Sequence, residues 1–469
     1  MTLAPETGLD VDIAIDAYTG AAPVSGRFAD DIRGWALAGP PTGEGFLPPH
    51  PTDPANWRDE RIGWGVVLAE TAGFTAEQLT ALEDVPEELR RLIDARAGKV
   101  LRYRAGATFS DWTLRDYAGG GDVFTAAAKM GMGPKELPGY LLIYGTPTAI
   151  PWHIQFQLHS VRHVGRIDLE GEALRNYVDA LLAEWADSAA SYADPVVWAV
   201  DHRSGEITTL MRNVVAEPLY RAFVEGGEHP TFIDGAVTEA TVGALTQALV
   251  SQHPAFVVTS SHGMTGPLDD LDAMRASMGL PVDQAHAVLD PDALLAQWQP
   301  DGAIWFAQAC CSAGAQSPST YHGLFQPQSQ LEQVMSGVAA AGAMISPLPR
   351  ALLGAKKPLR AFIGHVEPTF NWTLQFPPNR QQLTADLTKC LYDGVYGGLP
   401  VGLALDGFYD PVGSLLQGYL RALGTYRTTV GAAAKPSLDM LVYSRVTAHD
   451  RSSTVILGDP TVALPAPTP

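Results

Sequence analysis

Cysteine is scarce in this sequence, whose 469 residues contain only Cys310, Cys311 and Cys390. Two of the three are neighbours, so they cannot form the disulfide framework that stabilises many secreted proteins. Free thiols persist in reducing compartments. The cysteine content therefore predicts a cytoplasmic protein with reduced thiols.

Positive charge and long apolar stretches are also sparse. Lys and Arg number 31 against 51 Asp and Glu, which gives a net charge of −20. Such a chain repels nucleic-acid backbones and anionic membranes and attracts cationic peptides. No apolar run reaches the length of a membrane span, and residues 1–20 lack the regions of a signal peptide. We expect a soluble protein that binds neither nucleic acid nor membrane; the sequence leaves its oligomeric state open.

Short apolar segments alternate with helical patterns from residue 63 onward. Uninterrupted apolar runs predict buried strands, and apolar residues every three or four positions predict helices. Strands of this kind separated by helices are typical of a doubly wound α/β fold, with a mostly parallel sheet and helices on both faces. The expected strands are 63–70, 139–145, 196–202, 255–263, 303–310 and 454–460; the expected helices are 75–98 (divided at Pro86), 171–193, 238–252 (capped by Thr238) and 329–343.

The chain is long for one ordinary domain, so two subdomains are expected. Residues 1–55 are rich in Pro, Gly, Thr and Asp and show no period, which predicts an irregular N-terminal leader. Residues 56–193 are expected to form a smaller α/β subdomain. Residues 194–469 are expected to form a larger catalytic one, joined to the first by the 171–193 helix.

Two of the expected strands end in reactive residues. AFVVTSS leads into His262-Gly263, and AIWFAQA leads into Cys310. Ligands of parallel sheets bind at the carboxyl ends of the strands, and the intervening chain is long enough for one crossover helix. An imidazole near a thiol lowers the thiol's pKa and carries its proton. Gly263 lets a backbone N–H approach a developing oxyanion. The alternative is a capping histidine beside a cysteine that fills the core.

These segments resemble the caspase and gingipain superfamily of cysteine peptidases. An apolar strand ending in His-Gly precedes one ending in Gln308-Ala309-Cys310, at the caspase spacing. The chain departs from the caspase signature after Cys310, where Cys311-Ser312 follows and the glycine is displaced to Gly314. Gingipain-like and CHAT-type members are resembled more closely, in YLLIYGTPTAIPWHIQFQLHSVRHVGRIDLE (140–170) and in VILGDPTVALP (455–465).

The resemblance implies a role for each matching residue. Cys310 would be the nucleophile and His262 the general acid/base, while the N–H groups of Gly263 and Cys310 would form the oxyanion site. Gln308 would line the primary specificity pocket, and neither a metal nor an organic cofactor is implied. Neighbours on an extended segment face opposite ways, so Cys311 is expected to point away from His262. Cys390 is expected in the core.

Other motifs carry less chemistry. His159 and His163 have the spacing of helical metal ligands, but the glutamate of a zinc hydrolase helix is missing and the preceding WHIQFQL is interpreted as extended, so no metal site is predicted. The glycine-rich segments 118–124 and 130–139 lack the Lys-Ser/Thr of a phosphate loop. His365 ends another apolar run and is assigned a structural role.

Two functions stay open at this point. One is a cysteine endopeptidase that acts on proteins or peptides; the other is a catalytically silent relative that serves as a binding or signalling module. Segments 264–284 and 312–330 flank the site and have the composition of mobile binding loops. Asp269 and Asp270 in the first of them would favour Arg or Lys before the scissile bond, unless they are simply solvated.

Overall fold

The computed structural model describes residues 10–13, 24–27, 52–203 and 206–465. The chain divides into two units, Met1–Pro51 and Thr52–Pro469. In the first unit, β1 (Asp10–Ile13) pairs antiparallel with β2 (Val24–Arg27). The segment expected to be irregular therefore contains a two-stranded ribbon; the rest of it, up to Pro51, lies outside the described residues.

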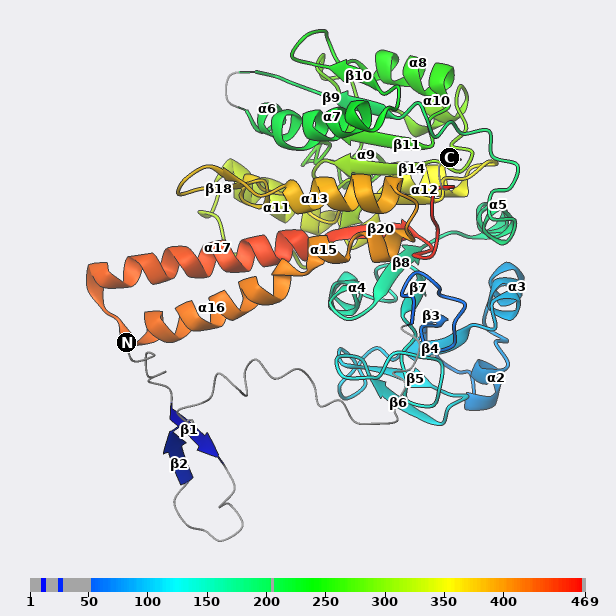
Figure 1. Ribbon diagram of the computed structural model, residues 1–469, viewed down its shortest axis with the longest axis vertical. Helices are drawn as coiled ribbons and strands as arrows, with labels where there is room; N and C mark the ends of the chain where they lie inside the picture. Colours follow the sequence, from blue (N-terminus) through cyan, green and yellow to red (C-terminus); the bar gives the residue numbers. More distant parts are fainter. Residues whose placement is uncertain (1–9, 14–23, 28–51, 204–205, 466–469) are drawn as a thin grey trace, which may run out of the picture. The chain divides into compact units, whose positions relative to one another are not determined.

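A 12-stranded sheet runs through the second unit (Figure 1). Its neighbouring strands are parallel except at β17–β20, β4–β5 and β5–β6. This confirms the predicted α/β class with a mostly parallel sheet. In spatial order the strands are β10 (Thr231–Asp234), β9 (Val196–Ala199), β11 (Phe256–Ser260), β14 (Ile304–Gln308), β17 (Ala361–His365), β20 (Thr454–Gly458), β8 (His163–Ile167), β7 (Tyr140–Tyr144), β3 (Trp64–Ala69), β4 (Lys99–Tyr103), β5 (Thr113–Asp116) and β6 (Gly121–Phe124).

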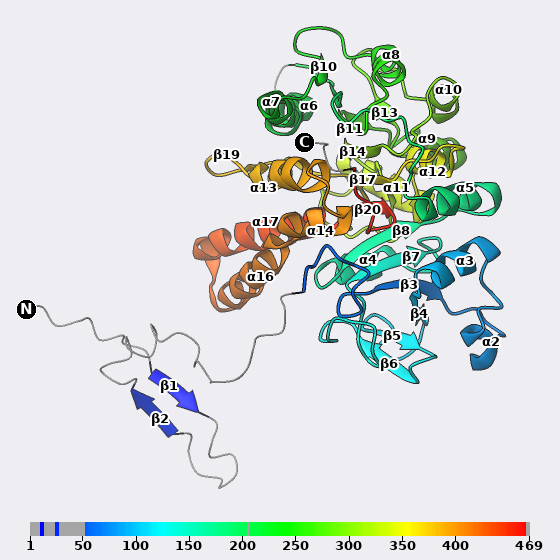
Figure 2. The ribbon, with the colours of Figure 1, turned by 45° about the vertical axis from the view of Figure 1, so that its right-hand side comes forward.

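Helices cover both faces of the sheet, which is why its central strands are buried along their whole length (Figure 2). One face carries a contacting series formed by α3 (Glu87–Ala95), α5 (Gly171–Leu182), α12 (Pro347–Gly354) and α10 (Pro291–Leu295). The other carries α7 (Glu217–Gly226), η4 (Cys390–Tyr396), α13 (Ala385–Lys389) and α14 (Val401–Ala404). Cys390 is buried in this second layer, as expected.

The remaining helices complete the layers and the loops. Among the described residues, no helix is both long and apolar enough to cross a bilayer. The remaining helices are α2 (Ala76–Thr80), α4 (Trp152–His159), α6 (Ile207–Met211), the π-helical turn η2 (Arg212–Ala216), α8 (Val242–Gln252), α9 (Leu271–Ser277), α11 (Gln330–Ala341), η3 (Asn371–Thr373), α15 (Asp406–Tyr409), α16 (Pro411–Thr428), η5 (Gly431–Ala434) and α17 (Lys435–Ser452).

Two predicted helices and one predicted extended segment need correction. Helix α5 ends at Leu182 rather than at 193, because Glu184 and Trp185 adopt positive φ and the Trp185 indole N–H bonds the Pro358 carbonyl oxygen. Helix α8 begins at Val242 with Thr241, not Thr238, as its cap. The segment WHIQFQL is the helix α4, whose N-cap is Pro151, and not an extended strand.

Two long helices near the C-terminus were not anticipated from the sequence. Helices α16 and α17 pack against each other as a hairpin, visible at the left of Figure 1. Most of the α16 side chains are exposed or only partly buried, and the hydrophobic pattern of α17 has no single apolar face. Amphipathic periodicity is the main signal by which helices are found in a sequence, and here it is weak.

Strand β20 joins the two halves of the sheet. It runs antiparallel to β17 on one side and parallel to β8 on the other, where Leu457 pairs with Arg166. The LGDP segment that ends β20 is buried, and Asp459 accepts hydrogen bonds from the Trp64 indole and the Arg96 guanidinium. The sheet is thus continuous across residue 193, with β20 lying between strands from 64–167 and strands from 196–365.

Close backbone packing at this junction predicts a selective effect of adding one methyl group. A Cβ at Gly165 would lie 2.1 Å from the Gly458 carbonyl oxygen. Gly165→Ala should therefore lower the free energy of unfolding by about 1–3 kcal/mol, the usual cost of overpacking, measured by urea denaturation. Gly121→Ala, also in a strand but with no heavy atom within 4 Å, is the control. Equal effects of the two changes would show that the junction is not tightly packed.

Candidate active site

The pairing of β11 with β14 brings the two predicted catalytic segments together. The strands are adjacent and parallel, with Ser260 opposite Gln308. Their carboxyl ends therefore lie at one edge, where Gly263 lies so close to Cys310 that a Cβ on the glycine would be 1.9 Å from the Cys310 carbonyl oxygen. This confirms that the segments carrying His262 and Cys310 follow neighbouring strands of one sheet.

The two cysteines lie in a turn rather than at the end of an extended strand. Strand β14 ends at Gln308, and Cys311 has a φ of 54°. Cys311 is fully buried with Met274 and Met278, whereas Cys310 is partly exposed. The alternation argument made for Cys311 does not apply, because the two cysteines lie beyond the end of the extended strand and Cys311 is left-handed.

The Cys310 thiol is held on the side of β17. Its Sγ contacts the Thr369 carbonyl oxygen at 3.9 Å, a weak hydrogen bond. Behind this residue, the buried Asp450 accepts hydrogen bonds from the hydroxyls of Thr369 and Thr373. Burial, reinforced by the negative field of Asp450, raises the pKa of the Cys310 thiol to about 11. In this arrangement the thiol is protonated at neutral pH.

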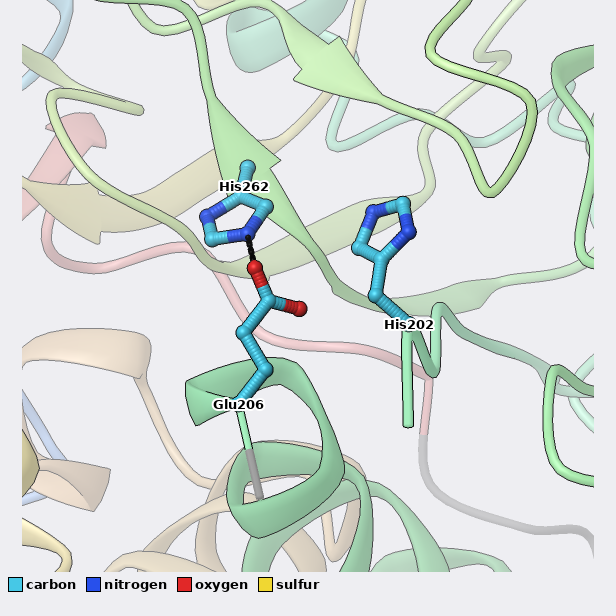
Figure 3. A group of neighbouring side chains, drawn as sticks. All are labelled: His202, Glu206 and His262. Carbon is cyan, nitrogen blue, oxygen red and sulfur yellow. Dashed lines mark hydrogen bonds and ion pairs between the residues drawn. The ribbon is translucent and has the colours of Figure 1, made fainter. Parts of the chain in front are cut away.

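The His262 imidazole is held on the side of β9. His262 and Gly263 form the short strand β12, which pairs antiparallel with β13 (Pro281–Val282). The ring Nε2 lies 2.6 Å from Oε1 of Glu206, the residue that precedes α6 (Figure 3). Within the described residues, Nδ1 of His262 has no hydrogen-bond partner, and the ring shares no hydrogen bond with the Cys310 thiol.

Glu206 is held firmly for a side chain that is only partly buried. Its second oxygen accepts a hydrogen bond from the hydroxyl of the buried Thr208, 2.8 Å away. Burial opposes ionisation of Glu206, but the hydrogen bonds from His262 and Thr208 outweigh it and keep the pKa of the carboxyl below its usual range. The carboxylate is therefore charged at neutral pH and accepts a hydrogen bond from Nε2–H of His262.

His202 completes the group drawn in Figure 3. Its ring stacks on His262 with centroids 5.6 Å apart and on His286 with centroids 4.8 Å apart. Burial, with the neighbouring histidines, lowers the pKa of His202 although Glu206 opposes the shift. Ligand atoms of His202, Glu206 and His262 all lie within 4.8 Å of one another, a group able to hold a metal ion.

Sequence reasoning missed Glu206, His202 and His286. A signal for His202 was present: VVWAVDH was recognised as a strand, and His202 stands at its carboxyl end, like His262 and Cys310. What was lacking was the strand order, since only the placement of β9 beside β11 makes that strand end part of the same edge. Glu206 and His286 lie beyond the strand ends, where no periodic pattern places a side chain.

The structure places the predicted substrate-binding residues in three different surroundings. Gln308 is buried and borders a cavity of about 10 Å³, room for at most one water molecule. Asp270 is the N-cap of α9, where its carboxylate accepts hydrogen bonds from the backbone N–H groups of Asp272 and Ala273. Asp269 is exposed. The segment 264–284 is therefore not simply a mobile loop, because it contains α9 and β13.

The other histidines considered from the sequence are separated. His159 ends α4 and bonds the Val164 carbonyl oxygen through Nε2, while His163 begins β8 and bonds Asp406 through Nδ1. They do not share one helical face. His365 is buried at the end of β17, where its Nδ1 lies 3.4 Å from the Thr454 hydroxyl. Its backbone N–H bonds Ser312, so it supports the turn after the cysteines.

Comparison with known proteins assigns the chain to no family. No model of a protein family matches the chain, and no curated protein has a significantly similar sequence. The chemistry of the site therefore rests on the residues described above.

The raised pKa of Cys310 predicts slow alkylation at neutral pH. Only the thiolate reacts, so the rate with iodoacetamide should rise about tenfold per pH unit from pH 7 to 10 and level off near the pKa of about 11. Site-resolved mass spectrometry follows Cys310 separately from Cys311 and Cys390. A rate that is already maximal at pH 7 would contradict the thiol environment described here.

Proposed function

We propose that the protein is a cysteine endopeptidase of the caspase/gingipain-like type, with Cys310 as nucleophile and His262 as general acid/base. The observation that carries the proposal is the meeting of His262-Gly263 and Cys310 at the ends of adjacent parallel strands, with the two backbones in contact. The reacting groups thus stand at one edge of a rigid sheet.

The proposed reaction uses groups already present at this edge. Sγ of Cys310 attacks the substrate carbonyl carbon while His262 Nδ1 takes the thiol proton. Backbone N–H groups of Gly263 and Cys310 stabilise the tetrahedral oxyanion. The protonated His262 then gives its proton to the leaving amine, and the thioester that remains is hydrolysed by water. No metal or organic cofactor is needed in this scheme.

Glu206 supports the proposal as a positioning residue. A base needs one free ring nitrogen and a second nitrogen held in a defined orientation. The hydrogen bond from Nε2 to Glu206 holds the ring and leaves Nδ1 without a hydrogen-bond partner among the described residues. The carboxylate would also stabilise the imidazolium formed when Nδ1 accepts the thiol proton. An imidazole without a neighbouring carboxylate would lack this stabilisation.

The resting arrangement is that of an inactive form. The thiol is bonded to the Thr369 carbonyl oxygen, so catalysis needs a movement that brings Sγ of Cys310 to Nδ1 of His262 while Nε2 stays bonded to Glu206. Catalytic hydrogen bonds often tighten only when substrate binds. The same observation favours the second candidate, a catalytically silent module with the peptidase fold, in which the thiol stays protonated permanently.

The substrate class follows from charge. The net charge of −20 and the exposed Asp269 would attract a basic peptide, so we propose cleavage after Arg or Lys. Asp270 contributes less than the sequence suggested, since its carboxylate caps α9. Gln308 would line the specificity pocket only after its small cavity opens. Three free thiols fit a reducing, cytoplasmic setting.

The assignment of the nucleophile predicts opposite results for the neighbouring cysteines. Cys310→Ala should abolish hydrolysis of a fluorogenic peptide library while leaving the unfolding midpoint almost unchanged, because the side chain is small and partly exposed. Cys311→Ala should keep most activity and lose about 1 kcal/mol of stability through the cavity left in the core. An inactive Cys311→Ala beside an active Cys310→Ala would reverse the assignment.

The positioning role of Glu206 predicts a graded series. Glu206→Ala should lower kcat at least about tenfold with little change in KM, because substrate contacts are unaffected while the base loses its orientation. Glu206→Gln keeps an acceptor for Nε2–H and should recover part of the loss. Glu239→Gln, at an exposed glutamate, serves as the control. Equal kcat values for the Ala and Gln variants would mean that the hydrogen bond does not matter.

A further inference from the structure

The three side chains at the β9–β11 edge form a donor set that the peptidase chemistry does not require. Two imidazoles and one carboxylate converge there, with ligand atoms within 4.8 Å of one another. The His262–Glu206 pair is explained by the orientation of the base. His202 is not: its Nε2 is buried and has no hydrogen-bond partner among the described residues. An unpaired buried nitrogen next to a carboxylate and a second imidazole requires an explanation.

We propose that His202, Glu206 and His262 bind Zn²⁺, and that the bound metal switches the peptidase off. Binding stands on the donor atoms alone, whereas the inhibitory effect rests on the proposed function. The set of two histidines and one glutamate matches the three-ligand type of zinc site, in which the fourth position is left to water. The three side chains are partly exposed, so an ion can enter from solvent.

The spacing of the donors suits a small cation after a modest adjustment. Zinc–ligand bonds of about 2.0 Å place tetrahedral ligands roughly 3.3 Å apart. The Nε2–Oε1 distance of 2.6 Å between His262 and Glu206 must widen, and the longer separations within 4.8 Å must shorten. The ion takes the place of the proton on Nε2 of His262, and the ring takes up one proton from solvent on Nδ1, so the imidazole stays neutral overall. Rotations of the three partly exposed side chains are the proposed route for both changes.

The surrounding residues hold two of the ligands in place. Thr208 donates its hydroxyl to Oε2 of Glu206, the kind of second contact that orients a ligating carboxylate. The backbone N–H of His202 bonds the same hydroxyl at 3.1 Å, so the two ligands share one anchor. The ring of His286 covers His202 almost in parallel, with an interplanar angle of 6°.

The chemistry of the donors selects among metals. Mg²⁺ and Ca²⁺ prefer oxygen ligands, and two of the three donors here are imidazole nitrogens. Imidazole with one carboxylate suits Zn²⁺. Calcium or magnesium is therefore not expected to compete at similar concentrations.

Inhibition follows from which ring nitrogen binds the metal. His262 faces Glu206 through Nε2, so Nε2 is the nitrogen that would ligate. A neutral imidazole bound through Nε2 carries its proton on Nδ1. That nitrogen then has no lone pair with which to accept the thiol proton of Cys310. One ion thus removes the base without touching the nucleophile.

Zinc titration of the full-length protein, monitored by competition with a fluorescent chelator, tests the binding. Wild type should bind one Zn²⁺ per chain. His202→Ala should bind Zn²⁺ at least about 100-fold more weakly, because loss of a residue that only supports a ligand already weakens binding about 10–100-fold. His229→Ala, which removes an exposed histidine with no side-chain partner among the described residues, should match wild type. Circular dichroism verifies that each variant is folded. Equal affinities of wild type and His202→Ala, or equal binding of Mg²⁺, would overturn the proposal.

Cobalt substitution separates this site from one built on the cysteine. Co²⁺ bound to nitrogen and oxygen should give visible d–d bands without a thiolate charge-transfer band. A thiolate charge-transfer band that is present in wild type and absent in Cys310→Ala would show that Cys310 binds the metal, and would refute the three-ligand set.

Activity then distinguishes the two proposals. Zinc should inhibit peptide hydrolysis, a chelator should reverse the inhibition, and His202→Ala, compared with its own metal-free rate, should need at least about 100-fold more zinc. A protein that binds zinc through His202 but never cleaves peptides would refute the peptidase and keep the metal site. An active enzyme whose zinc sensitivity does not depend on His202 would refute the metal site and keep the peptidase.

Discussion

The parallel pairing of β11 with β14 is the constraint on which the proposed site depends. Register places Ser260 opposite Gln308, and just beyond this pair Gly263 packs against the Cys310 carbonyl oxygen. No larger residue fits at that distance without displacing backbone. The histidine and cysteine are therefore brought together by main-chain geometry, and their side chains are free to be directed by the neighbouring loops.

Those neighbouring loops supply different hydrogen-bond partners to the two side chains. In the order β9–β11–β14–β17, the inner strands lead to His262 and Cys310, and the outer ones lead to their hydrogen-bond partners, Glu206 after β9 and Thr369 after β17. In the proposed mechanism the thiol leaves Thr369 to meet the imidazole, which Glu206 keeps oriented. Burial raises the pKa of the Cys310 thiol and so opposes formation of the thiolate. A zinc ion bound to Nε2 of His262 would, by the proposal above, remove the base as well.

The predictable part of the structure is the part set by local pattern. Continuous apolar runs identified β3, β7, β9, β11, β14 and β20, because strands buried on both faces leave that trace. Helix ends were less accurate: the stop of α5 depends on Trp185, whose indole bonds Pro358, far away in sequence. The α16–α17 hairpin escaped notice because its amphipathic pattern is weak. Cys310 and His262 could be identified from the sequence because they follow apolar strands. The place of Glu206 beside His262 could be identified only once the strand order was known. The burial of Gln308 beside a small cavity could be identified only from the packing.

The most direct test of the proposed function is covalent capture of the nucleophile. A short peptide ending in lysine and bearing an acyloxymethyl ketone reacts with an assembled Cys–His pair and is located by mass spectrometry. The account predicts one adduct, on Cys310, that is lost in His262→Ala, since the attacking thiolate is formed by proton transfer to the histidine. Capture on Cys311 or Cys390, or a Cys310 adduct that forms equally well without His262, would contradict it.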